Sequence, residues 1–301
     1  MARPFLKWAG GKRQLISEIE ARLPADIDDC TTYVEPFIGG GSVLFRMLEL
    51  FEFETVHVSD LNLELMLCYR TIREDADAVS GHLLSLSEMY PTDKEGQKAI
   101  YYSIRDEWNA GVGSGGQIEG EDAVARAART IFLNKTCFNG LFRVNKSGLF
   151  NVPCNYTKRP SLPTEAELLE VQEALQGADI RVAGFEECEG LVDEGSFVYF
   201  DPPYRPLSDT SGFVSYSKED FDDDDQRRLV ELFRRLDAKG ARLMLSNSDP
   251  RNTNPNDGFF DELYSGFRVE RVMARRSINS VGGGRGEITE ILVTNWDSLD
   301  A

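Results

Sequence analysis

Hydrophobic positions follow two spacings along the chain, one typical of buried strands and one typical of amphipathic helices. Apolar residues recur every three or four positions after Ser42 and across residues 222–238, which predicts helices there. Short apolar runs predict strands at residues 32–35, 55–59, 180–183, 197–200, 241–246, 267–273 and 288–294. Strands that alternate with helices predict an α/β fold with a mostly parallel, doubly wound sheet.

A long stretch between Asp60 and Ile180 interrupts this alternation. Its pattern predicts helices at 62–89, 95–109 and 121–135, a glycine-rich loop at 111–120 and an irregular segment that ends near Pro160. We therefore expect an inserted, mostly helical domain at residues 62–176. The first domain would consist of residues 1–61 and 177–301.

Composition narrows the class of protein. The 301 residues are 41% hydrophobic and 28% charged, which excludes a disordered or collagen-like chain. No apolar run is long enough to span a membrane and the N-terminus lacks a signal-peptide core, so we expect a cytoplasmic protein without membrane contact. Five cysteines are scattered without a CxxC pair, and there are only two histidines. This argues against disulfides, structural zinc and metal catalysis.

Charge is distributed unevenly along the sequence. The formal net charge is −18, which would repel nucleic acid if it were spread evenly. Residues 1–17, 126–160 and 271–286 nevertheless carry basic side chains and no acid. These segments predict a phosphate-binding face on an acidic body, with chance clustering and helix pairing as the alternative. The acidic excess suits a high-salt cytoplasm, in which charge repulsion is screened.

Residues 34–42 (VEPFIGGGS) join a predicted strand to a predicted helix through three glycines. Such a turn allows backbone to approach a nucleotide cofactor closely. The dinucleotide fingerprint GxGxxG is not met, because Leu44 stands where its third glycine belongs. Asp60 ends the next strand, where its carboxylate would accept hydrogen bonds from ribose hydroxyls. A glycine turn that serves packing alone is the alternative.

A strand also ends in the tetrapeptide Asp201-Pro202-Pro203-Tyr204. The two prolines lack backbone donors and stiffen the turn, so the Asp201 carboxylate and the Pro202 carbonyl form a corner rich in acceptors. Two acceptors that hold the hydrogens of an exocyclic base amine would expose its nitrogen lone pair to an electrophile. Tyr204 would stack on the base. A rigid proline turn without chemistry is the alternative.

The N-terminal segment FLKWAGGK contains a Gly-Gly-Lys that suggests a P-loop, but the pattern fails. Leu6 occupies the first glycine position, and Arg13 follows Lys12 where a Ser or Thr would hold magnesium. The segment remains a candidate anion-binding loop with an aromatic wall at Trp8.

The motifs WAGGK, EPFxGxGS and DPPY, in this order and with the insertion before DPPY, resemble the Dam-type DNA adenine-N6 methyltransferases. Residues 139–143 (NGLFR), 150–153 (FNVP) and 275–280 (RRSINS) extend the resemblance over nearly the whole chain. It implies a Rossmann-like methyltransferase sheet, an inserted target-recognition domain and S-adenosylmethionine as methyl donor, without a metal. By the family's pattern, the cofactor contacts are Trp8, Lys12, Phe37, Gly39, Asp60 and Asp201, and the catalytic group is Asp201, Pro202 and Tyr204.

The resemblance also implies double-stranded DNA as partner, with the target adenine flipped out because N6 is inaccessible in the stack. Arg143 matches a guanine-reading arginine, with a phosphate contact as the alternative. Phe138 and Asn139 match an intercalating aromatic and a polar contact to the DNA backbone, although Phe138 would equally suit the core. Arg275 and Arg276 would bind phosphate.

Members of the family commonly read GATC, which we adopt as the expected site. Thr157 departs from the family, which often has tyrosine before the following lysine. Two alternatives remain: a cytosine-N4 methyltransferase, since DPPY suits any exocyclic amine, and a DNA-binding module of this fold without turnover. An NAD-dependent dehydrogenase explains neither DPPY nor the basic segments. We expect a monomer, and leave open whether a cognate restriction nuclease exists.

Overall fold

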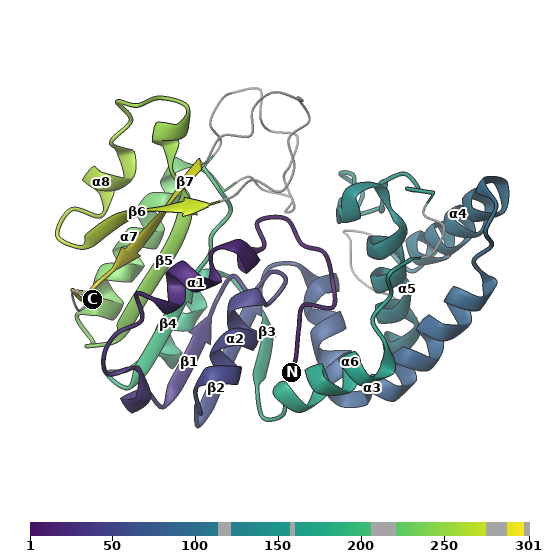
Figure 1. The fold of residues 1–301 in the computed structure, drawn as a ribbon, viewed down its shortest axis with the longest axis horizontal. Helices are drawn as coiled ribbons and strands as arrows, with labels where there is room; N and C mark the ends of the chain where they lie inside the picture. Colours follow the sequence, from purple (N-terminus) through teal and green to yellow (C-terminus); the bar gives the residue numbers. More distant parts are fainter. Residues whose placement is uncertain (114–121, 157–159, 206–220, 275–287, 298–301) are drawn as a thin grey trace.

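A seven-stranded sheet forms the centre of the protein (Figure 1). The computed structural model describes residues 1–113, 122–156, 160–205, 221–274 and 288–297. The strands lie in the order β3-β2-β1-β4-β5-β7-β6, and β7 runs antiparallel to its neighbours β5 and β6. The predicted α/β class and mostly parallel sheet are confirmed. All seven predicted strands are present: β1 Thr32–Glu35, β2 Thr55–Asp60, β3 Asp179–Val182, β4 Ser196–Phe200, β5 Arg242–Ser248, β6 Arg268–Ala274 and β7 Ile288–Thr294.

All five predicted helices are present, and the described residues add three that were not predicted, α1, α6 and α8. α6 was not predicted, although Thr164 and Glu167 form a capping box at its start. α3 contains a break at Asp75, whose φ of −153° is not helical. The helices are α1 Ile16–Glu20, α2 Ser42–Leu50, α3 Leu63–Met89, α4 Lys94–Ala110, α5 Ala123–Thr136, α6 Glu165–Ala174, α7 Asp223–Asp237 and α8 Phe259–Leu263.

Alternate residues of the central strands point to opposite faces of the sheet, as the pleat requires. Tyr33 and Tyr199 belong to one apolar cluster, whereas Val34 and Phe200 belong to another. The first cluster continues from the sheet into α3, α4 and α5, which lie on the right of Figure 1. The helical segment and the sheet therefore share a core, and the domain boundaries at residues 62 and 176 stay a prediction.

One residue of the expected phosphate-binding face lies inside the protein. Arg126 on α5 is fully buried, its Nη2 is 2.6 Å from Glu64 Oε1 on α3, and its guanidinium lies over the Trp108 ring. A guanidinium in this position cannot reach DNA, so the prediction is wrong for Arg126. That prediction rests on the charge of one segment alone, which does not distinguish a surface arginine from an arginine paired with an acid distant in sequence. Arg271 is likewise paired, with its Nη2 2.7 Å from Asp261 Oδ2.

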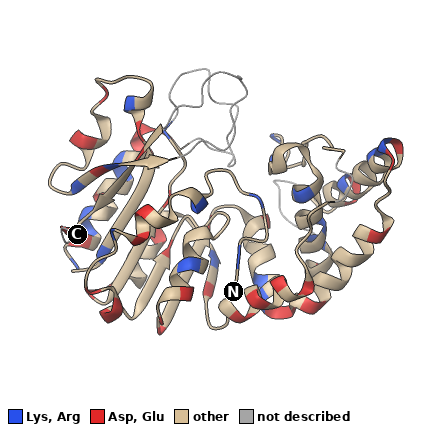
Figure 2. Ribbon diagram, viewed as in Figure 1, with Lys and Arg blue, Asp and Glu red and all other residues tan. Residues whose placement is uncertain are grey.

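Acidic residues are frequent along α3 and α6, at the bottom of the view in Figure 2. Within the described ranges, no helix is long and apolar enough to cross a membrane. Among the same residues, no three His, Cys, Asp or Glu side chains are grouped so that they could hold a metal ion.

Candidate active site

The strand order reverses between β1 and β4, and the predicted motifs meet at this reversal. In open α/β sheets, ligands bind outside the carboxyl ends of the strands at such a point. β1 ends at Glu35 and leads into the glycine turn, and β4 ends at Phe200, directly before Asp201. β2, on the other side of β1, ends at Asp60. Three segments distant in sequence therefore reach one edge of the sheet.

The glycine turn after β1 packs closely against two aromatic side chains. Gly39 and Gly41 have φ of +48° and +72°, a left-handed conformation that glycine adopts without strain. A Cβ on Gly39 would lie 3.1 Å from Trp8 Cδ1, and one on Gly41 would lie 2.5 Å from the Tyr69 hydroxyl oxygen. That hydroxyl donates a hydrogen bond to the Gly39 carbonyl at 3.1 Å. Both positions therefore require glycine.

Asp60 is oriented by the backbone of the same turn. Its Oδ2 accepts from the Gly39 N–H at 3.2 Å, and its Oδ1 accepts from the Asn62 N–H at 2.9 Å. Burial raises the pKa of Asp60 to about 6, although these two N–H groups oppose the shift. The carboxylate is thus held beside the glycine turn and is ionised at neutral pH.

An aromatic cluster lies at the same edge of the sheet. Phe37 stacks on Phe185 with 5.5 Å between ring centroids, and Phe221 contacts both rings edge-on at 5.7 and 5.8 Å. Phe185 was not predicted as a site residue, although it closely follows β3 at the carboxyl edge of the sheet. Flat apolar rings of this kind suit a nucleobase.

Lys12 connects the N-terminal loop to the DPPY motif. Its Nζ is 2.7 Å from Asp201 Oδ1, donates to the Tyr204 hydroxyl oxygen at 2.7 Å, and lies 3.7 Å from Glu290 Oε2 on β7. Asp201 Oδ1 also accepts from the Ser246 hydroxyl at 3.3 Å. Glu290 and Ser246 were not predicted, because neither belongs to a recognisable motif and only the sheet brings their strands to this site.

The charges of this cluster compensate one another. Burial raises the pKa of Asp201 to about 6, against the opposing effect of the Lys12 ammonium. Burial alone would lower the pKa of Lys12, but the neighbouring Asp201, Tyr204 and Glu290 raise it above its usual value. At neutral pH the site therefore combines a charged Lys12 with an ionised Asp201, which can only accept hydrogen bonds.

A cavity of about 400 Å³ opens beside Lys12. Its volume is within the range of small-molecule and cofactor sites. The N-terminal loop, the predicted recognition segment and the end of β7 all contribute to its walls, so the segments expected to carry chemistry and recognition face one space. The lining residues include Trp8, Lys12, Asn139, Leu141, Tyr204 and Glu290.

The predicted DNA-contacting residues lie in and after the 3-10 helix η3 (Phe138–Gly140). Phe138 is 50% exposed, which excludes the alternative that it belongs to the core. Asn139 has a left-handed φ of +57°. Arg143 is exposed, and its Nε donates to Asn151 Oδ1 at 2.7 Å. Arg275 and Arg276 lie outside the described residues.

Two contacts join the recognition segment to the N-terminal loop. The buried side chain of Asn134 on α5 makes hydrogen bonds to the backbone of both Lys7 and Gly140. The Trp8 ring stacks on Phe142 with 5.5 Å between centroids. Asn134 was not predicted, because a buried amide at the end of a helix resembles any other polar residue in sequence.

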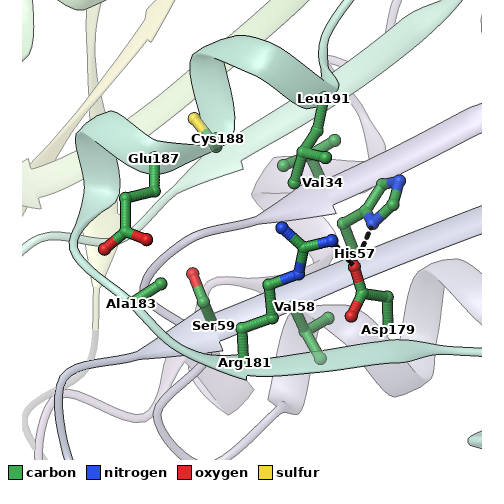
Figure 3. A pocket seen from close by; sticks show the side chains of 10 residues that line it. All are labelled: Val34, His57, Val58, Ser59, Asp179, Arg181, Ala183, Glu187, Cys188 and Leu191. Carbon is green, nitrogen blue, oxygen red and sulfur yellow. Dashed lines mark hydrogen bonds and ion pairs between the residues drawn. The ribbon is translucent and has the colours of Figure 1, made fainter.

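A second hollow lies between β1, β2, β3 and the 3-10 helix η4 (Phe185–Leu191) (Figure 3). Within it, Asp179 Oδ2 is 2.9 Å from His57 Nδ1 and 2.6 Å from Arg181 Nη2. Its volume of about 10 Å³ admits at most one water molecule. This hollow is therefore too small for a cofactor or a base.

Comparison with known proteins agrees with this arrangement. The family model of the D12 class N6 adenine-specific DNA methyltransferases matches residues 8–278, a range that includes all three motifs and the insertion. The chain belongs to this family. The Dam-type resemblance of the sequence is thereby confirmed.

Relatives of this D12-class methyltransferase cover nearly its full length. The type II methyltransferase M.MjaIII of Methanocaldococcus jannaschii is 47% identical over 98% of this chain and 99% of its own. The type II methyltransferase M1.LlaDCHI of Lactococcus lactis subsp. cremoris is 37% identical over 98% and 95%. The DNA adenine methylase of Escherichia coli (strain K12) is 33% identical over 96% and 94%. The resemblance therefore extends over the sheet and the helical insertion alike.

Proposed function

We propose that this protein methylates N6 of an adenine that is flipped out of duplex DNA, within the sequence GATC. The observation that carries the proposal is the Lys12–Asp201–Tyr204 cluster at the reversal of the sheet. Its Lys12 and Tyr204 line a cavity to which the recognition segment also contributes. The strand-end acceptors, the aromatic ring and the nearby exposed Phe138 together suit a base that enters from DNA.

The residues at the glycine turn fit S-adenosylmethionine, which supplies an electrophilic methyl group when bound. The turn carries no side chains, so that its backbone can approach a ligand closely. Asp60 presents an ionised carboxylate for ribose hydroxyls, and Phe37 with Phe185 offers an apolar wall for the adenine ring. By the family's pattern, Trp8, Lys12, Gly39 and Asp201 complete the cofactor site.

The chain's own part in the reaction is to hold the target amine. Asp201 and the Pro202 carbonyl would accept the two amine hydrogens, which favours a pyramidal nitrogen with an available lone pair. Tyr204, 38% exposed, would stack on the base. Because the sulfonium is already a good electrophile, alignment and electrostatics carry the reaction and no strong general base is needed.

The recognition segment would read and open the duplex. Phe138 would fill the space that the adenine leaves, and Asn139 would contact the DNA backbone beside it. Arg143 would donate to guanine O6 and N7, the commonest specific contact in the major groove. Arg275 and Arg276 would hold phosphates, by the family's pattern.

The names of the relatives support two biological settings. Two relatives are named type II methyltransferases, and others are named DNA adenine methylases. We expect a monomer that acts on double-stranded DNA, either alone or beside a restriction nuclease of the same specificity.

Transfer of label from S-adenosylmethionine to duplex DNA, followed by hydrolysis to nucleosides, tests the proposal. N6-methyladenine in the wild type and no label with Asp201→Asn are the expected results. N4-methylcytosine would favour the cytosine alternative, since DPPY chemistry suits either amine. DNA binding without cofactor binding or label would favour the module without turnover.

A further inference from the structure

Glu290 is a second carboxylate in the Lys12 cluster, and the reaction described above gives it no task. Its side chain is 14% exposed and lines the cavity. Its Oε2 has no hydrogen-bond partner among the described residues, and the Lys12 ammonium is 3.7 Å away. A buried carboxylate oxygen without a hydrogen bond is costly. The position therefore points to a partner that arrives in another state of the site.

Lys12 and the target amine compete for Asp201 Oδ1, which already accepts from the Ser246 hydroxyl as well. The Lys12 ammonium already lies 2.7 Å from Asp201 Oδ1. An amine that takes this oxygen must displace Lys12, and Lys12 is only 3% exposed, so solvent cannot compensate its charge. Among the described residues around its Nζ, the only other carboxylate is Glu290.

We propose that Glu290 is a positioning residue that receives the Lys12 ammonium when the target amine binds, and so releases Asp201 to accept the amine hydrogens. The inference rests on the methyl-transfer function proposed above. The exchange moves no proton: one ammonium and two carboxylates are present before and after it. The Lys12 N–H that donates a hydrogen bond to Asp201 before the exchange donates one to Glu290 after it.

The surrounding elements hold Glu290 in place for this exchange. Its backbone is paired on both sides, opposite Ser248 of β5 and Val272 of β6, so side-chain movement alone must close the gap. Among the described residues, the titratable groups beside Glu290 are Lys12, Asp201 and Tyr204, and the buried Glu35 and Tyr199 lie within electrostatic reach of Asp201. The next acid on that side, Asp249, is directed to the Thr289 hydroxyl and Arg271 instead.

The test compares Glu290→Gln with the wild type in single-turnover methylation of duplex DNA. We expect the rate to fall by roughly tenfold or more, since a charge-assisted hydrogen bond is lost in the reacting state. Affinity for S-adenosylmethionine should change less than about twofold, because Lys12 keeps its closer ion pair with Asp201 until the target amine binds. The negative charge of Glu290 raises the pKa of Asp201. Its removal should therefore lower that pKa and move the acid limb of the pH–rate profile to lower pH.

Two further variants distinguish positioning from structure. Glu290→Asp should restore part of the rate, because it restores the charge. Glu270→Gln is the matched control on the neighbouring strand β6: Glu270 pairs with Arg22 and Arg268 away from the cavity, so its loss should leave rate and profile unchanged.

An unchanged rate and acid limb in Glu290→Gln would overturn the proposal. A slower rate with an unmoved acid limb and no rescue by Glu290→Asp would also overturn it, since that pattern indicates a structural role. If the wild type transferred no methyl group at all, the proposed function would fail first and this inference with it.

Discussion

The side-chain amide of Asn134 binds the backbone of Lys7 in both directions. Its Oδ1 accepts from the Lys7 N–H at 2.8 Å, and its Nδ2 donates to the Lys7 carbonyl at 2.9 Å. The same Nδ2 donates to the Gly140 carbonyl at 2.9 Å. One buried side chain on α5 thus fixes the recognition segment to the loop that carries Trp8 and Lys12.

Replacement of Asn134 by Ala should therefore affect binding and chemistry together. The Lys7 N–H and carbonyl and the Gly140 carbonyl would lose their partner in a buried position, which should lower the free energy of unfolding by about 2–4 kcal/mol. Urea unfolding and equilibrium binding of S-adenosylmethionine and of DNA measure the effects. Asn256→Ala, at an exposed asparagine, is the control. Wild-type stability with wild-type affinities for both ligands would contradict the role given to Asn134.

Arg143→Ala should relax the choice of base at one guanine of the site by about 1–3 kcal/mol, because a bidentate contact to O6 and N7 would be lost. Methylation rates on duplexes with each single substitution in GATC measure this. Lys146 is an exposed lysine in the same segment, and Lys146→Ala is the control. It should at most lower the methylation rate on all the duplexes to the same extent. Equal weakening of every sequence by Arg143→Ala would assign Arg143 to phosphate instead.

Asp60→Asn should increase stability at neutral pH while it abolishes cofactor binding. Burial raises the pKa of Asp60 from 3.8 to about 6, so the folded state binds this proton more tightly than the unfolded state does. The stability that the bound proton contributes is lost as the pH rises through about 6. The neutral amide escapes that cost, but its single oxygen can accept from only one of the two backbone N–H groups that Asp60 holds. We therefore expect a net gain of about 1 kcal/mol in the free energy of unfolding at pH near 7.5. Urea unfolding should show the gain narrowing toward pH 5. A gain that is independent of pH, or a loss at neutral pH, would contradict this account.

Gly41→Ala should be more destabilising than Gly177→Ala. Both glycines have a φ near +75°, at +72° and +77°, so both variants bear the left-handed strain of about 1 kcal/mol. A Cβ on Gly41 would also meet the buried Tyr69 hydroxyl at 2.5 Å, whereas one on Gly177 would meet nothing within 4 Å. We expect thermal or urea unfolding to show a further loss of about 1–3 kcal/mol for Gly41→Ala. Equal losses in the free energy of unfolding would mean that the glycine turn accommodates the added methyl group without strain.

Much of the fold could be predicted from the sequence, because strand periodicity and glycine turns are local signals. The strand from Thr32 to Glu35 and the glycine turn after it are of this kind. The missed features depend on contacts between distant segments. Glu290 reaches Lys12 only because β7 inserts between β5 and β6, and Arg126 is buried only because α3 supplies Glu64. Neither pairing has a pattern that one segment alone could reveal.

The most direct test of the central claim is methylation of an unmethylated plasmid at molar and at dilute salt, with S-adenosylmethionine as donor. The product is then digested with a nuclease that cuts only methylated GATC. We predict cutting after treatment with the wild type and none with Asp201→Asn. Methyl label in the plasmid without cutting would support methyltransferase activity but reject GATC as the site. Neither label nor cutting at either salt, while the protein still binds the plasmid, would contradict the account.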